Sequence, residues 1–319
     1  MAAKNSGLTG ARAAKKDEFY TQLTDIEKEM KHYKQHFAGK VVFCNCDDPT
    51  WSEFWRYFHL NFEVLGLKKL VSTHYDPNNS TYKLEYTGGD DSDIEAGLKT
   101  PLTGNGDFRS DECIALLEES DICVTNPPFS LFTSFLAQLI EHNKKFVILG
   151  NINAATGKDI FPLIRENKLW LGPSISSGDR EFRVPNDYPL NAAGCRVDAD
   201  GNKYIRVKGV RWFTNLDNVK RHEQIVLWKT YAPDEYPTFD YYKAININKV
   251  SEIPQDYTGA MAVPITFLDK YCPEQFEILN CNDFRKGTVA QKPHGLIKDK
   301  EAKIGDRTTY ARILIKRKT

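Results

Sequence analysis

The 319-residue sequence has no apolar run long enough to cross a membrane, and its first residues lack the apolar segment of a secretory signal peptide. Its seven cysteines are an odd number scattered along the chain, which is typical of a reducing compartment rather than of a disulfide framework. Hydrophobic residues make up 41% and charged residues 27%, so neither disorder nor a fibrous repeat is indicated. We therefore expect a soluble, cytoplasmic protein with a sizeable core.

The sequence also lacks a net charge, whereas proteins that bind nucleic acids carry basic faces. The charges are nonetheless unevenly distributed. Basic residues dominate the N-terminal arm and the segment from residue 285 onwards, and acids concentrate at 90–95 and 118–121. This distribution fits one basic face for a polyanionic partner, and it fits solvated termini and an acidic loop equally well.

Metal ligands are scarce as well. Cys44 and Cys46 are spaced as a pair, but no second pair or nearby histidine completes a tetrahedral set. We therefore interpret them as buried thiols and expect no metal site.

Segments typical of strands and helices alternate between residues 41 and 150. We expect buried strands at 41–44, 69–73, 121–125 and 145–149, and amphipathic helices at 24–37, 53–62, 111–117 and 131–140. Such alternation predicts an α/β fold with an open, mainly parallel twisted sheet and helices on both faces. The loops at 45–49, 75–76, 105–108 and 126–129 would then share the carboxyl edge of the sheet, where ligands bind in such folds. The glycine-rich turn common in these folds is missing.

The sequence Asn-Pro-Pro-Phe at 126–129 follows one of these strands. The prolines fix φ and remove N–H groups, which leaves backbone carbonyl oxygens without local donors. The Asn126 side-chain oxygen and the Pro127 carbonyl could accept both hydrogens of one exocyclic amine, and Phe129 offers a face for stacking. That combination suits a nucleobase taken out of its stack. Without its context, the tetrapeptide would read equally well as a stiff turn.

Six strings of residues together resemble the EcoRI-type adenine-specific DNA methyltransferases: KDEFYTQ (16–22), VVFCNCDDP (41–49), GDFRS (106–110), DICVTNPPFSLF (121–132), ENKLWLG (166–172) and VPITFL (263–268). The resemblance implies a Rossmann-like S-adenosylmethionine-dependent methyltransferase fold with a DNA-recognition insertion. It further implies methylation of adenine N6 in double-stranded DNA after base flipping. The enzyme would belong to a type II restriction-modification system, act as a monomer, and have a restriction endonuclease as a functional but not physical partner.

The resemblance also implies roles for individual residues. The catalytic residues would be Asn126, Pro127, Pro128 and Phe129. Cofactor contacts would come from Phe19, Tyr20 and Thr21 over the methionine part, from Asn45, Cys46 and Asp47 or Asp48 at its amino-acid end, from Asp76 at the ribose, from Asp107 and Phe108 at the adenine, and from Asn126. A second aromatic residue, Phe182 or Trp212, would complete the stack over the flipped base.

The expected domain organisation has four parts: a mobile basic arm (1–15), a cofactor-binding and catalytic core (16–170), remaining core strands with the target-recognition insertion (171–260), and C-terminal core strands with a basic tail (261–319). Within the last part, the apolar segment 262–268 contains Pro264, which favours an edge strand or a loop over a central strand.

Two other functions remain open from the sequence. Asn-Pro-Pro-aromatic also serves methyltransferases that act on RNA adenine or on protein glutamine. A silent protein could instead use the cofactor fold only to hold DNA, although such a protein need not keep the amine acceptors.

Overall fold

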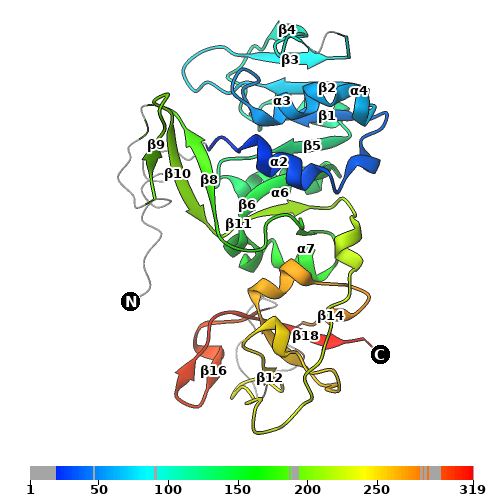
Figure 1. Ribbon diagram of the computed structural model, residues 1–319, viewed down its shortest axis with the longest axis vertical. Helices are drawn as coiled ribbons and strands as arrows, with labels where there is room; N and C mark the ends of the chain where they lie inside the picture. Colours follow the sequence, from blue (N-terminus) through cyan, green and yellow to red (C-terminus); the bar gives the residue numbers. More distant parts are fainter. Residues whose placement is uncertain are drawn as a thin grey trace. The chain divides into compact units, whose positions relative to one another are not determined.

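The chain forms two compact units, described by a computed structural model over residues 19–45, 47–89, 92–186, 188, 194–280, 283, 286 and 296–318 (Figure 1). Unit 1 comprises Met1–Ile152 and Ser177–Leu216, and unit 2 comprises Asn153–Ser176 and Asp217–Thr319. The expected range 171–260 is thus divided between the units, and 261–319 belongs to unit 2.

Unit 1 is built on a twisted sheet with the strand order β4-β3-β2-β1-β5-β6-β11. Its centre is parallel: β2 (Lys69–Thr73), β1 (Val41–Cys44), β5 (Ile122–Thr125) and β6 (Lys145–Asn151) run in one direction. The outer strands β3 (Tyr82–Tyr86), β4 (Leu98–Pro101) and β11 (Val210–Thr214) pair antiparallel to their neighbours. The predicted α/β fold with a mainly parallel sheet is confirmed.

The strand order reverses between β1 and β5. From β1 the chain proceeds outwards to β2, and from β5 it proceeds in the other direction to β6. In open α/β sheets such a switch point leaves a crevice at the carboxyl ends of the two strands, because their crossover helices lie on opposite faces. The loops at 45–49 and 126–129 begin at this crevice.

Neighbouring side chains of β11 confirm that helices cover both faces. Trp212 packs edge-to-face against Phe54 of α3 (Glu53–Leu60), with 6.0 Å between the ring centroids. The next residue, Phe213, packs against Phe132 of α6 (Phe132–Glu141) at 4.9 Å. Successive strand residues point to opposite faces, so α3 and α6 lie on different sides of the sheet.

Serine side chains cap the N-termini of two helices. Ser52 Oγ accepts hydrogen bonds from the N–H groups of Phe54 and Trp55, which begins α3. Ser110 Oγ accepts one from Cys113 N–H at the start of α5 (Asp111–Glu119). The short α4 (Phe62–Leu65) ends at Gly66, whose φ of +63° suits a left-handed helix end.

The helix expected at 24–37 is shorter than its apolar period. α2 spans Leu23–Met30, and after a turn the 3₁₀ helix η1 covers Lys34–His36. Ile26, Met30, Tyr33 and Phe37 are all fully buried. The spacing therefore predicted the buried face correctly, although a turn interrupts the helix that carries it.

A three-stranded antiparallel sheet forms the rest of unit 1, in the order β8 (Asp179–Val184), β10 (Lys203–Lys208) and β9 (Arg196–Val197). Strand β8 also pairs with the start of the described chain through a bridge between Tyr20 and Arg183. The 3₁₀ helix η2 (Ile152–Thr156) begins directly after β6.

Unit 2 has short elements around a second sheet, in the order β12 (Ile245–Asn246), β13 (Met261–Pro264), β18 (Arg312–Arg317) and β14 (Phe276–Ile278), with β15 (Leu296–Ile297) also paired to β18. The other elements of unit 2 are α7 (Phe161–Arg165), β7 (Trp170–Leu171), β16 (Lys303–Ile304), β17 (Arg307–Thr308), and the 3₁₀ helices η3 (Val219–His222), η4 (Val250–Glu252), η5 (Ile265–Lys270) and η7 (Asp299–Glu301).

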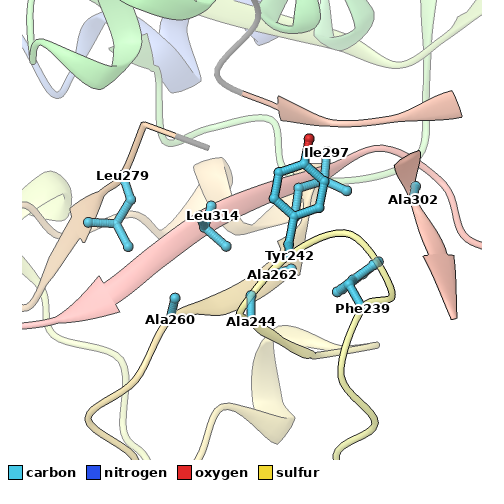
Figure 2. Close-up of a cluster of buried hydrophobic side chains, with 9 residues drawn as sticks. All are labelled: Phe239, Tyr242, Ala244, Ala260, Ala262, Leu279, Ile297, Ala302 and Leu314. Carbon is cyan, nitrogen blue, oxygen red and sulfur yellow. The ribbon is translucent and has the colours of Figure 1, made fainter. Parts of the chain in front are cut away.

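The core beside this second sheet combines alanines with larger apolar side chains. Ala244, Ala260 and Ala262 lie among the larger side chains of Phe239, Tyr242 and Leu314, as Figure 2 shows. The expectation of an edge strand or loop at 262–268 was wrong for its first residues, because β13 lies between β12 and β18. Pro264 is tolerated because it is the last residue of that strand.

Among the residues that the structure describes, no helix is both long and apolar enough to span a membrane.

Candidate active site

Asn45 joins three strands at the switch point. Its backbone carbonyl accepts a hydrogen bond from Thr125 Oγ1 at 2.9 Å, and its side-chain oxygen accepts one from Thr73 Oγ1 at 3.2 Å. Asn45 is fully buried, so it holds the ends of β1, β2 and β5 together. Cys46, the next residue expected in the site, lies outside the described residues.

The side chain of Asn126 is oriented by the main chain of Phe19. Asn126 Nδ2 donates to the Phe19 carbonyl at 2.5 Å. A carbonyl can only accept, so this bond fixes which end of the amide is nitrogen. Asn126 Oδ1 is buried and accepts no hydrogen bond from any described residue. The site therefore holds an oriented, unused acceptor, which is costly unless a donor arrives.

Aromatic rings surround the Asn-Pro-Pro-Phe segment. The Phe129 ring meets Phe19 at 5.6 Å and Phe182 at 6.3 Å between centroids, both nearly perpendicular to it. Phe19 also contacts Phe182 at 5.8 Å and Tyr188 at 6.3 Å. Phe129 is only 5% exposed. A ring that stacks on Phe129 therefore requires Phe19 or Phe182 to move aside.

The two candidates for the second stacking ring, Phe182 and Trp212, lie in different places. Phe182, on β8, belongs to this aromatic cluster, whereas Trp212 is fully buried in the main sheet and packs against α3. Of the two, Phe182 is the one placed beside Phe129.

Hydrogen bonds from two other segments hold residues 19–21: Asn126 bonds to Phe19, and Arg183 bonds to Tyr20. Tyr20 N–H donates to the Arg183 carbonyl at 2.9 Å, and Arg183 N–H returns a bond to the Tyr20 carbonyl at 3.1 Å. The guanidinium of Arg183 lies 5.0 Å from the ring centre of Trp51, which is exposed in the loop after β1. Thr21 Oγ1 is buried without a partner among the described residues. Sequence reasoning missed Arg183 because its contribution is mostly from the main chain.

Asp47 is the carboxylate closest to the switch point. Its N–H donates to the Thr73 carbonyl at 2.9 Å, its own carbonyl accepts from Ser72 Oγ, and its side chain accepts from Ser52 Oγ. Burial raises the pKa of Asp47 from 3.8 to about 7, against the lowering effect of the Ser52 hydrogen bond. Such a carboxyl group has a strong electrostatic need for a cationic partner.

Asp48 differs from Asp47 in having several hydrogen-bond donors around its carboxylate. It accepts hydrogen bonds from Thr50 N–H, Thr50 Oγ1 and Tyr82 OH, and His74 Nε2 lies 3.5 Å away. Asp48 therefore serves the local turn, whereas the side-chain donor to the Asp47 carboxylate is Ser52 Oγ.

The loops that carry Asp76 and Asp107 lie against each other. Asp76 N–H donates to the Asn105 carbonyl at 3.0 Å. Gly106 has a φ of +77°, and a Cβ there would collide with the His74 carbonyl oxygen. Only glycine permits this close approach.

Both carboxylates are held locally as ions. Asp76 accepts from Asn78 N–H and Asn79 Nδ2, and these bonds lower its pKa. The Asp107 pKa is lowered by Arg109, which binds Asp107 through its N–H, Nε and Nη2. A carboxylate has about four acceptor positions, so Asp107 keeps roughly one for a ligand.

Phe108 is largely internal. It is 3% exposed, packs edge-to-face on Phe135 at 5.1 Å, and its carbonyl accepts from Gln138 Nε2 at 3.0 Å. Its ring packs against α6 and offers little free surface to a ligand. Among the described residues, no group of three or more possible ligands is arranged for a metal ion.

The chain is similar to known proteins over nearly its whole length. The family described as "Adenine-specific methyltransferase EcoRI" matches residues 7–318. The Type II methyltransferase M.EcoRI of Escherichia coli is 45% identical, over 99% of this chain and 98% of the relative. M.MpnI of Mycoplasma pneumoniae is 39% identical, over 97% of both chains. M.MgeORF184P of Mycoplasma genitalium is 38% identical, over 96% of this chain and 97% of the relative.

No solved structure matches the chain. The family match and the three relatives agree with the resemblance noted in the sequence. The chain therefore belongs to the EcoRI family of adenine-specific methyltransferases.

Proposed function

We propose that this chain transfers a methyl group from S-adenosylmethionine to N6 of an adenine flipped out of double-stranded DNA. Family membership supports adenine methylation, and relatives that are named Type II methyltransferases support DNA as the substrate. The observation that carries the chemistry is the buried Oδ1 of Asn126, which is oriented by the Phe19 carbonyl and unused.

The acceptors of the site suit an exocyclic amine. Asn126 Oδ1 would accept one amine hydrogen and the Pro127 carbonyl the other, which draws the nitrogen lone pair away from the ring. Both oxygens would also stabilise the positive charge that develops on the nitrogen during attack. Pro128 keeps the turn rigid, and Phe129 stacks on the base once the neighbouring ring has moved. The surplus proton leaves to water, so no strong base is needed.

The cofactor, when bound, supplies an activated methyl group on a positively charged sulfur. Asp47 would face its ammonium group, because a buried carboxyl group with a pKa near 7 gains most from a cation. Phe19, Tyr20 and Thr21 would close over the methionine part beside Asn45. Asp76 would hold the ribose hydroxyls, and Asp107 would use its remaining acceptor position for the adenine amino group, beside Phe108.

The biological setting follows from the same relatives. The chain would protect host DNA in a type II restriction-modification system, with an endonuclease as its functional partner. We further propose that it works as a cytoplasmic monomer, since methylation of one strand per visit needs one active site. Target recognition would come from residues within 171–260.

The test is modified-base sequencing of DNA from cells that express the protein, beside cells that express Asn126→Ala. New N6-methyladenine at a defined sequence is expected only with the unaltered protein. Gln35→Ala, at an exposed residue of η1 that has no proposed role in the site, is the matched control and should methylate normally. If no new methyladenine arises, the proposed function is wrong. If methylation persists in Asn126→Ala, the role of Asn126 is wrong.

A further inference from the structure

We propose that unit 2 contains a binding site for a phosphate group, formed by Arg221 and Asn218 beside Trp170. The guanidinium of Arg221 lies 3.8 Å above the ring centre of Trp170. One of its nitrogens, Nη2, donates to Asn167 Oδ1 at 2.7 Å. Stacking and this bond hold the guanidinium plane in one orientation, as in other arginine sites for planar, bidentate recognition of oxyanions.

Arg221 has no carboxylate partner among the described residues. Two acids, Asp217 and Glu274, act on Arg221 electrostatically. Both are bound by His222, at 2.8 Å through Nε2 and 2.9 Å through Nδ1. Burial lowers the Arg221 pKa, and the two acids offset this only in part, without an ion pair to the guanidinium among the described residues. A half-buried arginine whose neighbouring acids are bound by another side chain is suited to an external anion.

Two buried N–H donors in this place are unused. Arg221 Nε and Asn218 Nδ2 have no acceptor among the described residues. Asn218 is 3% exposed, and its Oδ1 accepts the backbone N–H of Arg221, so its amide nitrogen must point the other way. Buried donors of this kind are normally satisfied, and an acceptor with several oxygens would satisfy both.

These donors line a partly enclosed pocket that also contains Trp170, Lys220, Lys270 and a single acid, Asp269. Lys220 is paired with Glu223 at 2.7 Å. Arg221 and Lys270 still outnumber Asp269 in the pocket lining, which favours an anionic ligand. The pocket has room for more than one water molecule, which rules out a purely packed core position. The chemistry is that of a tetrahedral oxyanion.

The source of that phosphate is argued from the proposed function, on which this step rests. A DNA methyltransferase must hold the duplex backbone to position one base, and phosphate contacts do this without reading sequence. Asn167 and Trp170 lie in ENKLWLG (166–172), one of the strings that carry the family resemblance, and neither takes part in the methyl-transfer site. We therefore assign the site to a DNA backbone phosphate rather than to free phosphate.

The experiment measures binding of the full chain to a short DNA duplex of arbitrary sequence, by fluorescence anisotropy over a range of NaCl concentrations. Arg221→Met is expected to weaken binding about tenfold, as for loss of one charge-assisted hydrogen-bonded contact. The slope of log affinity against log salt should fall by about 0.9, the value for one phosphate. Arg221→Lys should keep most of the slope, because it keeps the charge.

The matched control is Arg165→Met. Arg165 is a half-buried arginine of the same unit whose partner is Glu166, at 3.7 Å. The Arg165→Met variant should bind DNA like the unaltered chain.

The binding test is independent of the methylation test because it does not measure methyl transfer. The phosphate site can be wrong while the chain methylates DNA, and the chain can fail to methylate DNA while the phosphate site is present.

Asn218→Asp guards against a folding defect in Arg221→Met. Aspartate keeps the acceptor for Arg221 N–H but replaces the unused donor by a negative oxygen, which repels phosphate and neutralises Arg221. Urea unfolding should show this variant folded, with DNA binding weakened as in Arg221→Met.

A second arm uses inorganic phosphate alone. Thermal unfolding is compared in phosphate and in chloride at equal ionic strength, for the unaltered chain and for Arg221→Met. If phosphate stabilises only the unaltered chain while Arg221→Met binds DNA as tightly as the unaltered chain, the site takes free phosphate and its assignment to DNA is wrong. If neither the salt slope nor the phosphate-dependent stability changes in the variants, the site does not exist.

Discussion

Replacing Asp47 by asparagine should make the protein more stable and a poorer enzyme. Burial raises the pKa of this carboxyl group from 3.8 to about 7, so the folded state resists its negative charge. Asparagine has nearly the same shape and can still accept the Ser52 hydroxyl bond. It removes the charge that the folded state has to hold.

The magnitude follows from the pKa difference. At about 1.4 kcal/mol per pH unit, a shift of about three units costs the folded state roughly 4 kcal/mol once the group is ionised in both states. Below about pH 4 the carboxyl is protonated in both states and costs nothing. Between about pH 4 and pH 7 the unfolded chain holds fewer protons than the folded chain, so stability falls as pH rises. Above about pH 7 the cost is constant.

The Asp47→Asn variant would recover only part of this energy, about 2 kcal/mol, because the new amide is itself a polar group that costs free energy to bury. The free energy of unfolding in urea, measured for both proteins from about pH 4 to pH 8, should therefore diverge as pH rises. Asp76→Asn is the control for stability: its carboxylate is held by hydrogen bonds from Asn79 and Asn78, which lower its pKa, so its loss brings no gain at neutral pH. Binding of S-adenosylmethionine to Asp47→Asn, measured by calorimetry, should be weaker than to the unaltered protein, although the variant is the more stable of the two.

A stability difference between Asp47→Asn and the unaltered protein that does not depend on pH would refute this reasoning. So would a variant that is less stable at about pH 8. Either result would mean that the Asp47 carboxylate is not destabilised by burial in the folded chain.

Three further changes test the site. Phe129→Ala should lower kcat for methyl transfer far more than Phe129→Tyr, because tyrosine keeps the stacking ring; equal losses would contradict a stacking role. Gly106→Ala should cost about 1–3 kcal/mol in urea unfolding, since its Cβ would collide with the His74 carbonyl, and Gly201→Ala, with positive φ but open space, should cost less. Ser52→Ala should cost about 1 kcal/mol as a lost helix cap. It should also raise the Asp47 pKa further, seen as a stability profile that keeps falling above about pH 7; an unchanged profile would deny the Ser52–Asp47 bond any electrostatic role.

The parallel sheet of unit 1 and its carboxyl edge could be predicted because the apolar strand patterns and the helix starts are local features of the sequence. Ser52 and Ser110 cap the helices that follow them, and four apolar strands form the parallel centre. A strand such as β5 is buried on both faces, so its sequence needs no long-range information to be recognised.

The second unit was not predictable for the opposite reason. Its strands are two to six residues long and pair across large separations, as β13 does with β18. Phe182 and Trp212 show the same difficulty: both are buried aromatic residues on strands. Which of them reaches the site depends on which sheet holds the strand, and neither residue type nor spacing reports that.

The bond from Asn126 to the Phe19 carbonyl has a consequence for mutational scanning and for sequence drift. Every residue type offers the same main-chain oxygen at position 19, so replacing that side chain alters packing and leaves the amide orientation untouched. The dependence of the Asn126 orientation on residue 19 can be detected only by a substitution that moves the main chain. Tyr20→Pro, which deletes the N–H bonded to the Arg183 carbonyl, should therefore disable catalysis, and Tyr20→Phe, which keeps that N–H, should not.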